Sequence, residues 1–224
     1  MTHQLRVTLE VGLKGKQVAA VAADWPGLER GGKTADIAIA KLQSYVPRYA
    51  HIAKLAGMDQ AFAATTTVDV VEQYSGTGST DFWGISFAFS SIDQQAMSKE
   101  ELDRELTLLQ ACWAFFDIVR FRVSAEMRKG PRGGGRDRDH IVRHTIVAEQ
   151  DWATGLGLPR IENIYLDEDL LKAHRNAFCH AIREFHSQGK ISGKWPLRYL
   201  IRHTAYHTLD HAWEMQDKDL TEPS

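Results

Sequence analysis

Apolar and polar residues alternate strictly at the start of the chain. One face of this segment carries Leu5, Val7, Leu9 and Val11, and the residues between them are polar or charged. Such a period of two predicts a half-buried β-strand. A short glycine-containing turn and a second apolar run follow, so the pattern predicts a β-hairpin over residues 4–23.

The segment that follows the hairpin is rich in proline and glycine. Residues 24–34 carry a Pro-Gly pair and a Gly-Gly pair, which predict a loop. Thr34 is placed to cap a helix that begins at residue 35. Pro47 is expected to break or kink this helix, and Gly57 is a natural end for the helical piece beyond it.

Two further strands are predicted before the composition changes. TTTVDVVEQY at residues 65–74 is rich in β-branched residues, and ISFAFS at residues 85–90 places three large apolar side chains on one face. The first part of the chain, residues 1–92, is therefore expected to form a small α+β domain with the element order ββαββ.

From Ser98 onward the apolar residues recur at helical spacing. Ser98 and Glu101 form a capping box for a long helix that Gly130 is expected to end. Three more helices are predicted, at residues 139–155, 167–186 and 196–215. Four helices with short to medium connections predict a helical bundle over residues 93–224, so the fold class is α+β.

Composition narrows the range of partners. The chain has 224 residues, 43% of them hydrophobic, and a formal net charge of −2. This charge argues against nucleic acid as a partner, and no apolar run is long enough to span a membrane. Cys112 and Cys179 lie in apolar helical patterns and are expected to be buried thiols of a reducing, cytoplasmic compartment.

The most informative stretch is the last helix, with histidines at positions 203, 207 and 211. His203 and His211 are separated by about 12 Å along a helix, at roughly 1.5 Å per residue, so one ion cannot be held by all three. At about 100° per residue, His211 and His207 face the apolar stripe while His203 points to its edge. The expected metal ligands are therefore His207 and His211, with His203 at the rim or supporting a ligand.

A pair of histidines does not complete a metal site, because a catalytic zinc ion typically takes three protein ligands and a water. Ligands in helical bundles project inward from facing helices. His144 and His174 each lie on the apolar face of their own predicted helix. The geometry of the pattern leaves both open as the third ligand.

Two segments, IVRHTIVAEQDWA and HTAYHTLDHAWE, together resemble the DinB/YfiT-like superfamily over roughly residues 98–215. The resemblance implies a four-helix bundle that holds a divalent metal through a histidine on its second helix and an H-x-x-x-H pair on its last. Carried over to this chain, the ligands are His144, His207 and His211. The chain departs from the pattern after its last histidine, where Ala212-Trp213-Glu214 replaces Arg-Gly-Gln, and this leaves the substrate open.

A second resemblance concerns the N-terminal part. A hairpin followed by DWPGLERGGKTADIAIAKL is similar to the HicB-type antitoxin fold over about the first 60 residues. The alternative is a small sheet-and-helix layer with no activity of its own.

The resemblance to the DinB/YfiT-like proteins implies a metal-dependent enzyme that carries out thiol S-transfer or hydrolysis on a small molecule. The metal would be zinc, nickel or iron, and a low-molecular-weight thiol would serve as co-substrate. Residues proposed to assist catalysis are Glu149, Asp210 and His203. A glycine- and arginine-rich loop at residues 128–139 and the helix after it offer Arg132, Arg136 and Arg143 for a substrate anion.

The alternative function is a binding or regulatory module with a structural metal or none. The N-terminal layer would then mediate contact with a partner or with a second copy in a homodimer. A fourth protein ligand would favour the structural metal, and an open coordination position would favour the enzyme.

Overall fold

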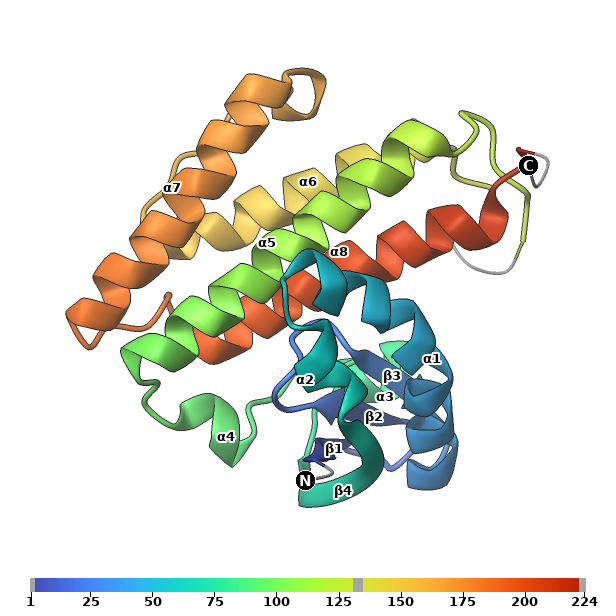
Figure 1. Cartoon of the computed structure of the whole chain (residues 1–224), viewed down its shortest axis with the longest axis vertical. Helices are drawn as coiled ribbons and strands as arrows, with labels where there is room; N and C mark the ends of the chain where they lie inside the picture. Colours follow the sequence, from blue (N-terminus) through green and yellow to red (C-terminus); the bar gives the residue numbers. More distant parts are fainter. Residues whose placement is uncertain (1–2, 131–134, 222–224) are drawn as a thin grey trace.

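The computed structural model describes residues 3–130 and 135–221. Its four strands are β1 His3–Val11, β2 Val18–Ala22, β3 Glu29–Gly32 and β4 Thr65–Ser75. They form one sheet in the order β3-β2-β1-β4, in which β1 is antiparallel to β2 and parallel to β4. Parallel neighbours need a crossover connection, and the helix α1 (Ala35–Leu55) lies on that connection (Figure 1). We call these strands and α1 the sheet layer.

The predicted hairpin is present, and its alternation decides what each face contacts. Leu5, Val7 and Leu9 join the hydrophobic core together with Leu42 and Tyr49 of α1. The opposite face of β1 carries Thr8 and Glu10, which are also buried. A strand with both faces covered needs hydrogen-bond partners for its polar side chains. For Glu10 these partners are Thr80 and the segment from Ser86 to Ala88.

The prediction of a strand at residues 85–90 is wrong. The backbone there is irregular, because the Glu10 carboxylate accepts hydrogen bonds from the backbone N–H groups of Phe87 and Ala88, each at 3.0 Å. The fourth strand is instead β3, inside the predicted loop 24–34, so the element order up to β4 is βββααβ rather than ββαββ. A Cβ atom at Gly31 of β3 would lie 1.9 Å from the carbonyl oxygen of Gly84, which explains a glycine in this strand.

Helix α1 runs from Ala35 through Pro47 to Leu55 as one element. Thr34 caps it through the Ile37 N–H, as predicted, and Gly57 follows its end in the left-handed conformation. Pro47 lies inside the helix but does not end it. The buried side chains of Tyr49 and Ile52 anchor the turns after Pro47 in the core, and this packing offsets the lost backbone hydrogen bond.

Helices dominate the rest of the chain. Three short helices were not predicted: α2 Asp59–Ala63, α3 Gly78–Trp83 and α4 Ser91–Gln94. The long helices are α5 Lys99–Arg122, α6 Arg138–Ala153, α7 Glu168–Ser187 and α8 Leu197–Lys218, and two 3-10 turns, Thr154–Leu156 and Ile164–Leu166, separate α6 from α7. The chain thus has a mixed α and β fold with a small four-stranded sheet in its N-terminal part.

The start of α5 agrees with its prediction and its end does not. Ser98 and Glu101 form the capping box. The helix ends at Arg122 instead of at Gly130, because Val123 is extended and the Ser124 N–H donates to the Asp219 side chain at 2.9 Å.

Cys112 and Cys179 are buried free thiols, as predicted. Among the residues described, every helix falls short of the length and apolar character that a bilayer crossing requires.

Helix α5 contacts α1 of the sheet layer directly (Figure 1). Helix α8 packs against α5 and α6 and also reaches the sheet layer, where the ring of Trp213 lies 5.1 Å from that of Tyr45 on α1. Its contact with the layer is close: a Cβ atom at Gly27 would lie 2.8 Å from the Leu209 side chain. Gly27 also has a φ of 93°, in the left-handed region that favours glycine. Only glycine therefore fits at position 27, where the turn between β2 and β3 packs against α8.

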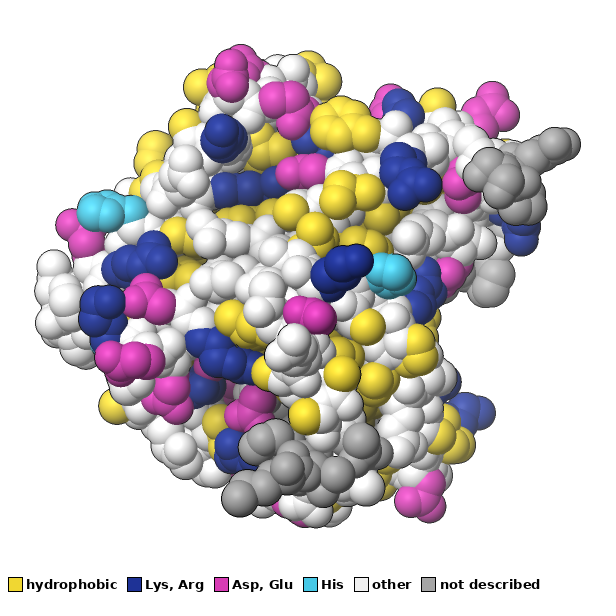
Figure 2. Space-filling model, viewed as in Figure 1, with side chains coloured by type: hydrophobic (Ala, Val, Ile, Leu, Met, Phe, Trp, Pro, Cys, Tyr) yellow, Lys and Arg dark blue, Asp and Glu magenta, His cyan; other side chains and the backbone are white. Residues whose placement is uncertain are grey.

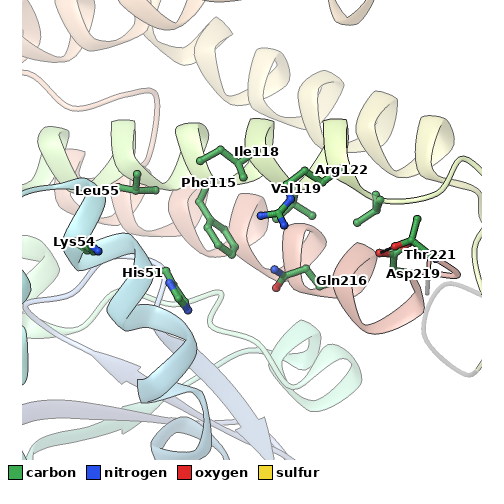
Figure 3. Close-up of a pocket in the computed structure, with 11 residues that line it drawn as sticks. His51, Lys54, Leu55, Phe115, Ile118, Val119, Arg122, Gln216, Asp219 and Thr221 are labelled. Atoms are coloured by element: carbon green, nitrogen blue, oxygen red, sulfur yellow. Dashed lines mark hydrogen bonds between the residues drawn. The ribbon is translucent and has the colours of Figure 1, made fainter. Parts of the chain in front are cut away.

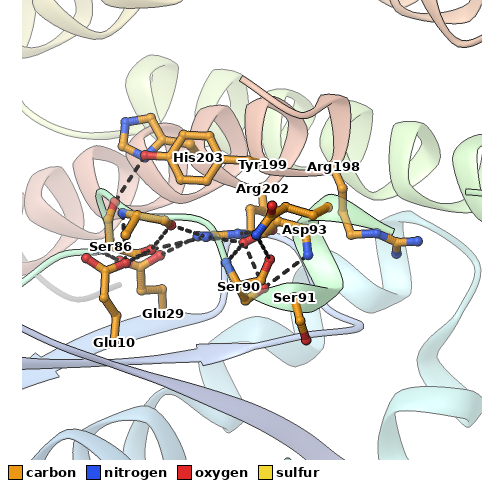
Figure 4. Close-up of polar contacts among 12 residues, drawn as sticks. Glu10, Glu29, Ser86, Ser90, Ser91, Asp93, Arg198, Tyr199, Arg202 and His203 are labelled. Atoms are coloured by element: carbon orange, nitrogen blue, oxygen red, sulfur yellow. Dashed lines mark hydrogen bonds and ion pairs between the residues drawn. The ribbon is translucent and has the colours of Figure 1, made fainter. Parts of the chain in front are cut away.

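A buried polar cluster joins the two parts of the chain (Figure 4). Arg202 of α8 donates to Asp93 at 2.6 and 2.8 Å and to Ser86 at 3.1 Å, and its guanidinium lies 3.6 Å from Glu29. Burial opposes ionisation of Asp93, but Arg202 holds the pKa of that carboxyl below its usual value. Burial raises the pKa of Glu29 to about 7, with Arg202 opposing the rise. Residues of the two predicted domains, 1–92 and 93–224, thus contact one buried cation, Arg202.

We expect Arg202→Met to lower the free energy of unfolding by about 3–5 kcal/mol, because it leaves buried carboxylates without their cation. Urea denaturation at pH 7 measures this difference. Arg143→Met, at an exposed position on α6, is the control and should change the value by less than about 0.5 kcal/mol. A loss below about 1 kcal/mol for Arg202→Met would show that the cluster contributes little to stability.

Candidate metal centre

Three histidines come together where α6 crosses α8. Each of His144, His207 and His211 offers one ring nitrogen, and these three atoms all lie within 4.8 Å of one another. The ring centroids are 5.1 Å apart for His144 and His207, 5.0 Å for His144 and His211, and 4.5 Å for His207 and His211. This is the set of three that the sequence predicted, and it could hold a metal ion.

Local structure explains how the rings meet. His207 and His211 are one turn apart on α8, on the side that faces α6. Asp137 caps α6 by accepting from the His140 N–H at 2.7 Å, and His144 follows one turn later. The position of His144 is thus fixed by the start of its helix, which the sequence indicates through Asp137.

The ring separations suit a single ion. With metal–nitrogen bonds of about 2.0–2.1 Å and tetrahedral angles, three imidazole centroids around one ion would be about 5 Å apart. The three observed separations are close to this value. The buried Nδ1 atom of His207 also has no hydrogen-bond partner among the described residues. A buried nitrogen without a partner is costly unless a ligand or an ion satisfies it.

Glu214 orients one of the rings. Its Oε2 atom lies 2.8 Å from Nδ1 of His211. An ionised carboxylate only accepts hydrogen bonds, so Nδ1 carries the proton and the lone pair of Nε2 remains for a metal. Glu214 also accepts from Arg136 at 2.9 Å and from Lys218 at 2.9 Å. Burial opposes its ionisation, but His211 and Lys218 hold its pKa well below the usual value.

The sequence reasoning did not identify Glu214 as part of the site. The signal was present, because an acid three residues after a helical histidine lies on the same face. In the comparison with the DinB/YfiT-like pattern, Glu214 counts only as part of the segment Ala212-Trp213-Glu214 that replaces Arg-Gly-Gln, and no role is predicted for it.

Two of the three rings are held in the neutral form that binds metal. Burial lowers the pKa of His207 well below its usual value, and His211 and His144 lower it further. Burial and the neighbouring His211 also lower the pKa of His144. A neutral imidazole is the form that coordinates, so the site does not have to release protons from these rings near neutral pH.

One side of the group is open. His211 is buried, His207 is half-buried and His144 is exposed. Within the described part of the chain, no fourth histidine, cysteine or acidic residue belongs to the group. An ion held here would therefore retain a position for water or a small molecule.

His203 is not at the rim, where the helical wheel placed it. Its side chain is buried among the rings of Phe87, Trp152, Trp195 and Tyr199, and it stacks on Tyr199 at a centroid distance of 5.2 Å. Burial, and then the nearby Arg202, lower its pKa to about 3. A helical wheel with one apolar stripe places His203 at the edge of the buried face. Because α8 is covered on several sides, this position is buried as well.

Trp152 connects this aromatic cluster to the three histidines. Its ring centroid lies 4.9 Å from that of His203 and 5.1 Å from that of His207. It also lines a cavity of about 280 Å³ together with Trp195. Aromatic side chains thus form the wall on one side of the site.

The acidic residues proposed for catalysis are engaged elsewhere. Glu149 is buried, with Oε1 lying 3.4 Å from Nε of Arg175 on α7, and Asp210 lies 3.3 Å from Arg30 of β3. Neither belongs to the group of three donors. Their catalytic roles stay predictions. His174, the alternative third ligand, is buried on α7 and also lies outside the group.

The proposed anion-binding arginines are spread over different surroundings. Arg136 pairs with Glu214 and so supports the site from behind the His211 ring. Arg143 is exposed and lines a cavity of about 410 Å³ with Arg160. Arg132 lies outside the residues that the structure describes.

Comparisons with protein-family models, with curated proteins and with solved structures found no match to this chain.

We expect Glu214→Gln to weaken Zn²⁺ binding by about 10- to 100-fold, because the amide cannot hold the His211 ring as an ionised carboxylate does. Competition with a chromophoric chelator measures the affinity. Asp217→Asn is the matched control, since Asp217 is exposed on the same helix and pairs with Arg48. Equal affinities for the two variants would contradict the role of Glu214.

The lowered pKa of His203 predicts that the free energy of unfolding decreases in acid. Its folded pKa of about 3 lies below its unfolded value of 6.5, so the unfolded chain takes up this proton first as the pH falls. The stability from neutral His203 is present above pH 6.5 and decreases toward pH 3. Between pH 7 and pH 5 the loss should be about 2 kcal/mol, at about 1.4 kcal/mol per pH unit below 6.5.

Chemical denaturation of chelator-treated protein at both pH values tests this expectation. His203→Phe should lack this part of the loss, while histidines 144 and 207 contribute to both proteins alike. The same pH dependence in the variant and the wild type would show that His203 is not the acid-sensitive group.

Proposed function

We propose that this chain binds one divalent metal ion through His144, His207 and His211, and acts as a metal-dependent enzyme on a small molecule. The reaction would be thiol-dependent S-transfer or hydrolysis. The observation that carries the proposal is the group of three imidazoles on two crossing helices, with one side open to solvent. An open side is what distinguishes a catalytic site from a closed structural one.

When bound at such a site, a divalent ion acts as a Lewis acid that lowers the pKa of a water or thiol beside it. Four residues around the three histidines would support such chemistry. Glu214 fixes the proton of His211 on Nδ1, while Arg136 and Lys218 keep Glu214 ionised. Trp152 packs against His207 and excludes water from one side.

The resemblance to the DinB/YfiT-like superfamily supports the same function. In that superfamily the ligands come from the second and last helices of a four-helix bundle. Here the three histidines come from α6 and α8, the second and last of the four long helices that follow residue 98. We therefore propose that α5, α6, α7 and α8 are a bundle of this type, that the ion is zinc, nickel or iron, and that a low-molecular-weight thiol is the co-substrate.

Metal content tests the first half of the proposal. We expect about one metal ion per chain in protein purified without a histidine tag or chelator, measured by elemental mass spectrometry. His144→Ala and His211→Ala should each lose it. His180→Ala, an exposed histidine on α7, is the control and should keep it. Absence of metal from the wild type after reconstitution with Zn²⁺, Ni²⁺ and Fe²⁺ would overturn the proposal.

Activity of the metal-loaded protein tests the second half. Thiol consumption with an electrophilic aryl halide and hydrolysis of an activated ester distinguish the two reactions. Metal-dependent turnover that is lost in His211→Ala would support an enzyme. One metal per chain without turnover in either assay would favour the alternative, a binding module with a structural metal.

A further inference from the structure

A cavity of about 830 Å³ lies between α1, α5 and the end of α8 (Figure 3). None of the three metal-site histidines lines it. Its volume is in the range of small-molecule sites, about 300–1,000 Å³. It is therefore a second candidate site, separate from the metal centre.

One wall of the cavity is apolar. Phe115, Ile118 and Val119 of α5 face Leu55 of α1 across it (Figure 3). Phe115 and Val119 are nearly buried, but Leu55 and Ile118 remain 46% and 42% exposed. In the space-filling view, hydrophobic and basic side chains meet where α1 approaches the long helices (Figure 2). Contact with the apolar part of a ligand would remove this surface from water.

Basic side chains border the same cavity. His51 and Lys54 come from α1, and Arg122 reaches in from the last turn of α5 (Figure 3). Nearby arginines have carboxylate partners: Arg48 lies 2.8 Å from Asp217, and Arg120 lies 2.8 Å from Asp117. Within the described residues, neither Lys54 nor Arg122 has a carboxylate within ion-pair distance.

Asp219 lines the cavity but does not neutralise these cations. Its side chain accepts from the backbone N–H and the hydroxyl of Ser124 at 2.9 and 3.0 Å, and from the Thr221 N–H at 3.0 Å. These donors hold the pKa of Asp219 well below its usual value, although what burial it has opposes this. Asp219 therefore stays ionised and is held within its own loop, and the two cations Lys54 and Arg122 against this one carboxylate leave the lining with a net positive charge.

Helix ends alone do not account for this arrangement. Lys54 and Arg122 both lie in the last turn of a helix, where a cation stabilises the helix dipole. That effect does not require the two side chains to face one apolar cleft from opposite sides. Charge and apolar surface together favour a ligand that has both.

We infer that this cavity binds an amphipathic organic anion. Its carboxylate, sulfonate or phosphate group would lie between Lys54 and Arg122, and its apolar body would lie against Phe115 and Ile118. The inference does not depend on the metal centre, because no residue of that centre takes part.

Two fluorescent probes that differ only by a sulfonate group test the inference. One is 1-anilinonaphthalene-8-sulfonate, and the other is N-phenyl-1-naphthylamine, which lacks the sulfonate. We expect the sulfonate to bind with a stoichiometry near one, at least tenfold more tightly than the neutral probe, and equally well in the presence of a chelator. Lys54→Gln and Arg122→Gln should each weaken sulfonate binding by about tenfold, because each removes a charge-assisted contact.

Control variants keep the test specific. Lys41→Gln on α1 and Lys99→Gln on α5 remove exposed cations from the same two helices and should change neither affinity. Ile118→Asp should weaken binding of both probes. Thermal melts would establish that all the variants fold.

Sulfonate binding that survives both Lys54→Gln and Arg122→Gln would overturn the inference, as would equal affinity for the two probes. Binding that is instead lost on Phe82→Ser would place the dye at the exposed Phe82 and Trp83 side chains, which are 74% and 65% exposed, and would also overturn it.

Discussion

Burial of α8 obliges its charged side chains to find partners inside the protein, because an unpaired buried charge is very costly. Three neighbouring elements supply such partners. Arg198 pairs with Glu105 of α5, Arg202 with Asp93 of α4, and Asp210 with Arg30 of β3. These pairs set the position of the sheet layer and of α5 against a common helix, so the fold depends on the last long helix of the chain.

The metal centre follows from the same constraint. Toward α6, the polar residues of α8 are histidines, and burial keeps His207 neutral rather than paired with an acid. The one acid on this side, Glu214, holds a ring nitrogen and is itself held by Arg136 and Lys218. Structural ion pairs and candidate metal ligands are therefore two roles of one buried polar helix. They differ in the side chain that the neighbouring element presents, which is a charged partner from α5, α4 and β3 and is His144 from α6.

Local signals in the sequence were sufficient for the hairpin, for the caps at Thr34 and Ser98, and for the pair His207 and His211. Each of these depends on residues close together in the chain or on a helical repeat. The third histidine, His144, was preferred to His174 only through the resemblance to the DinB/YfiT-like superfamily. The failures involve long-range contacts. Residues 85–90 alternate like a strand, yet a glutamate from β1 takes the backbone donors that a strand would use.

Strand β3 and the surroundings of His203 illustrate the same limit. The sequence ERGG has no alternation, and it becomes a strand because β2 offers a free edge after a tight turn. His203 was placed by a helical wheel, which has no information about the tryptophans that cover it from α6 and from the loop before α8. Contacts with residues far away in the sequence decide the structure at these positions, and a local sequence pattern gives no information about such contacts.

The buried cluster around Arg202 also constrains the order in which the protein can assemble on the ribosome. The strands of the sheet are all available once Ser75 has been synthesised, and N-terminal segments generally fold first. Glu10 and Glu29 belong to those strands, but the cation beside them arrives about 170 residues after Glu29. Residues 80–88 can cover the Glu10 carboxylate soon after the sheet is made. The Glu29 carboxylate, by contrast, lacks its buried cation until α8 emerges, so this part of the sheet reaches its final state only at the end of translation.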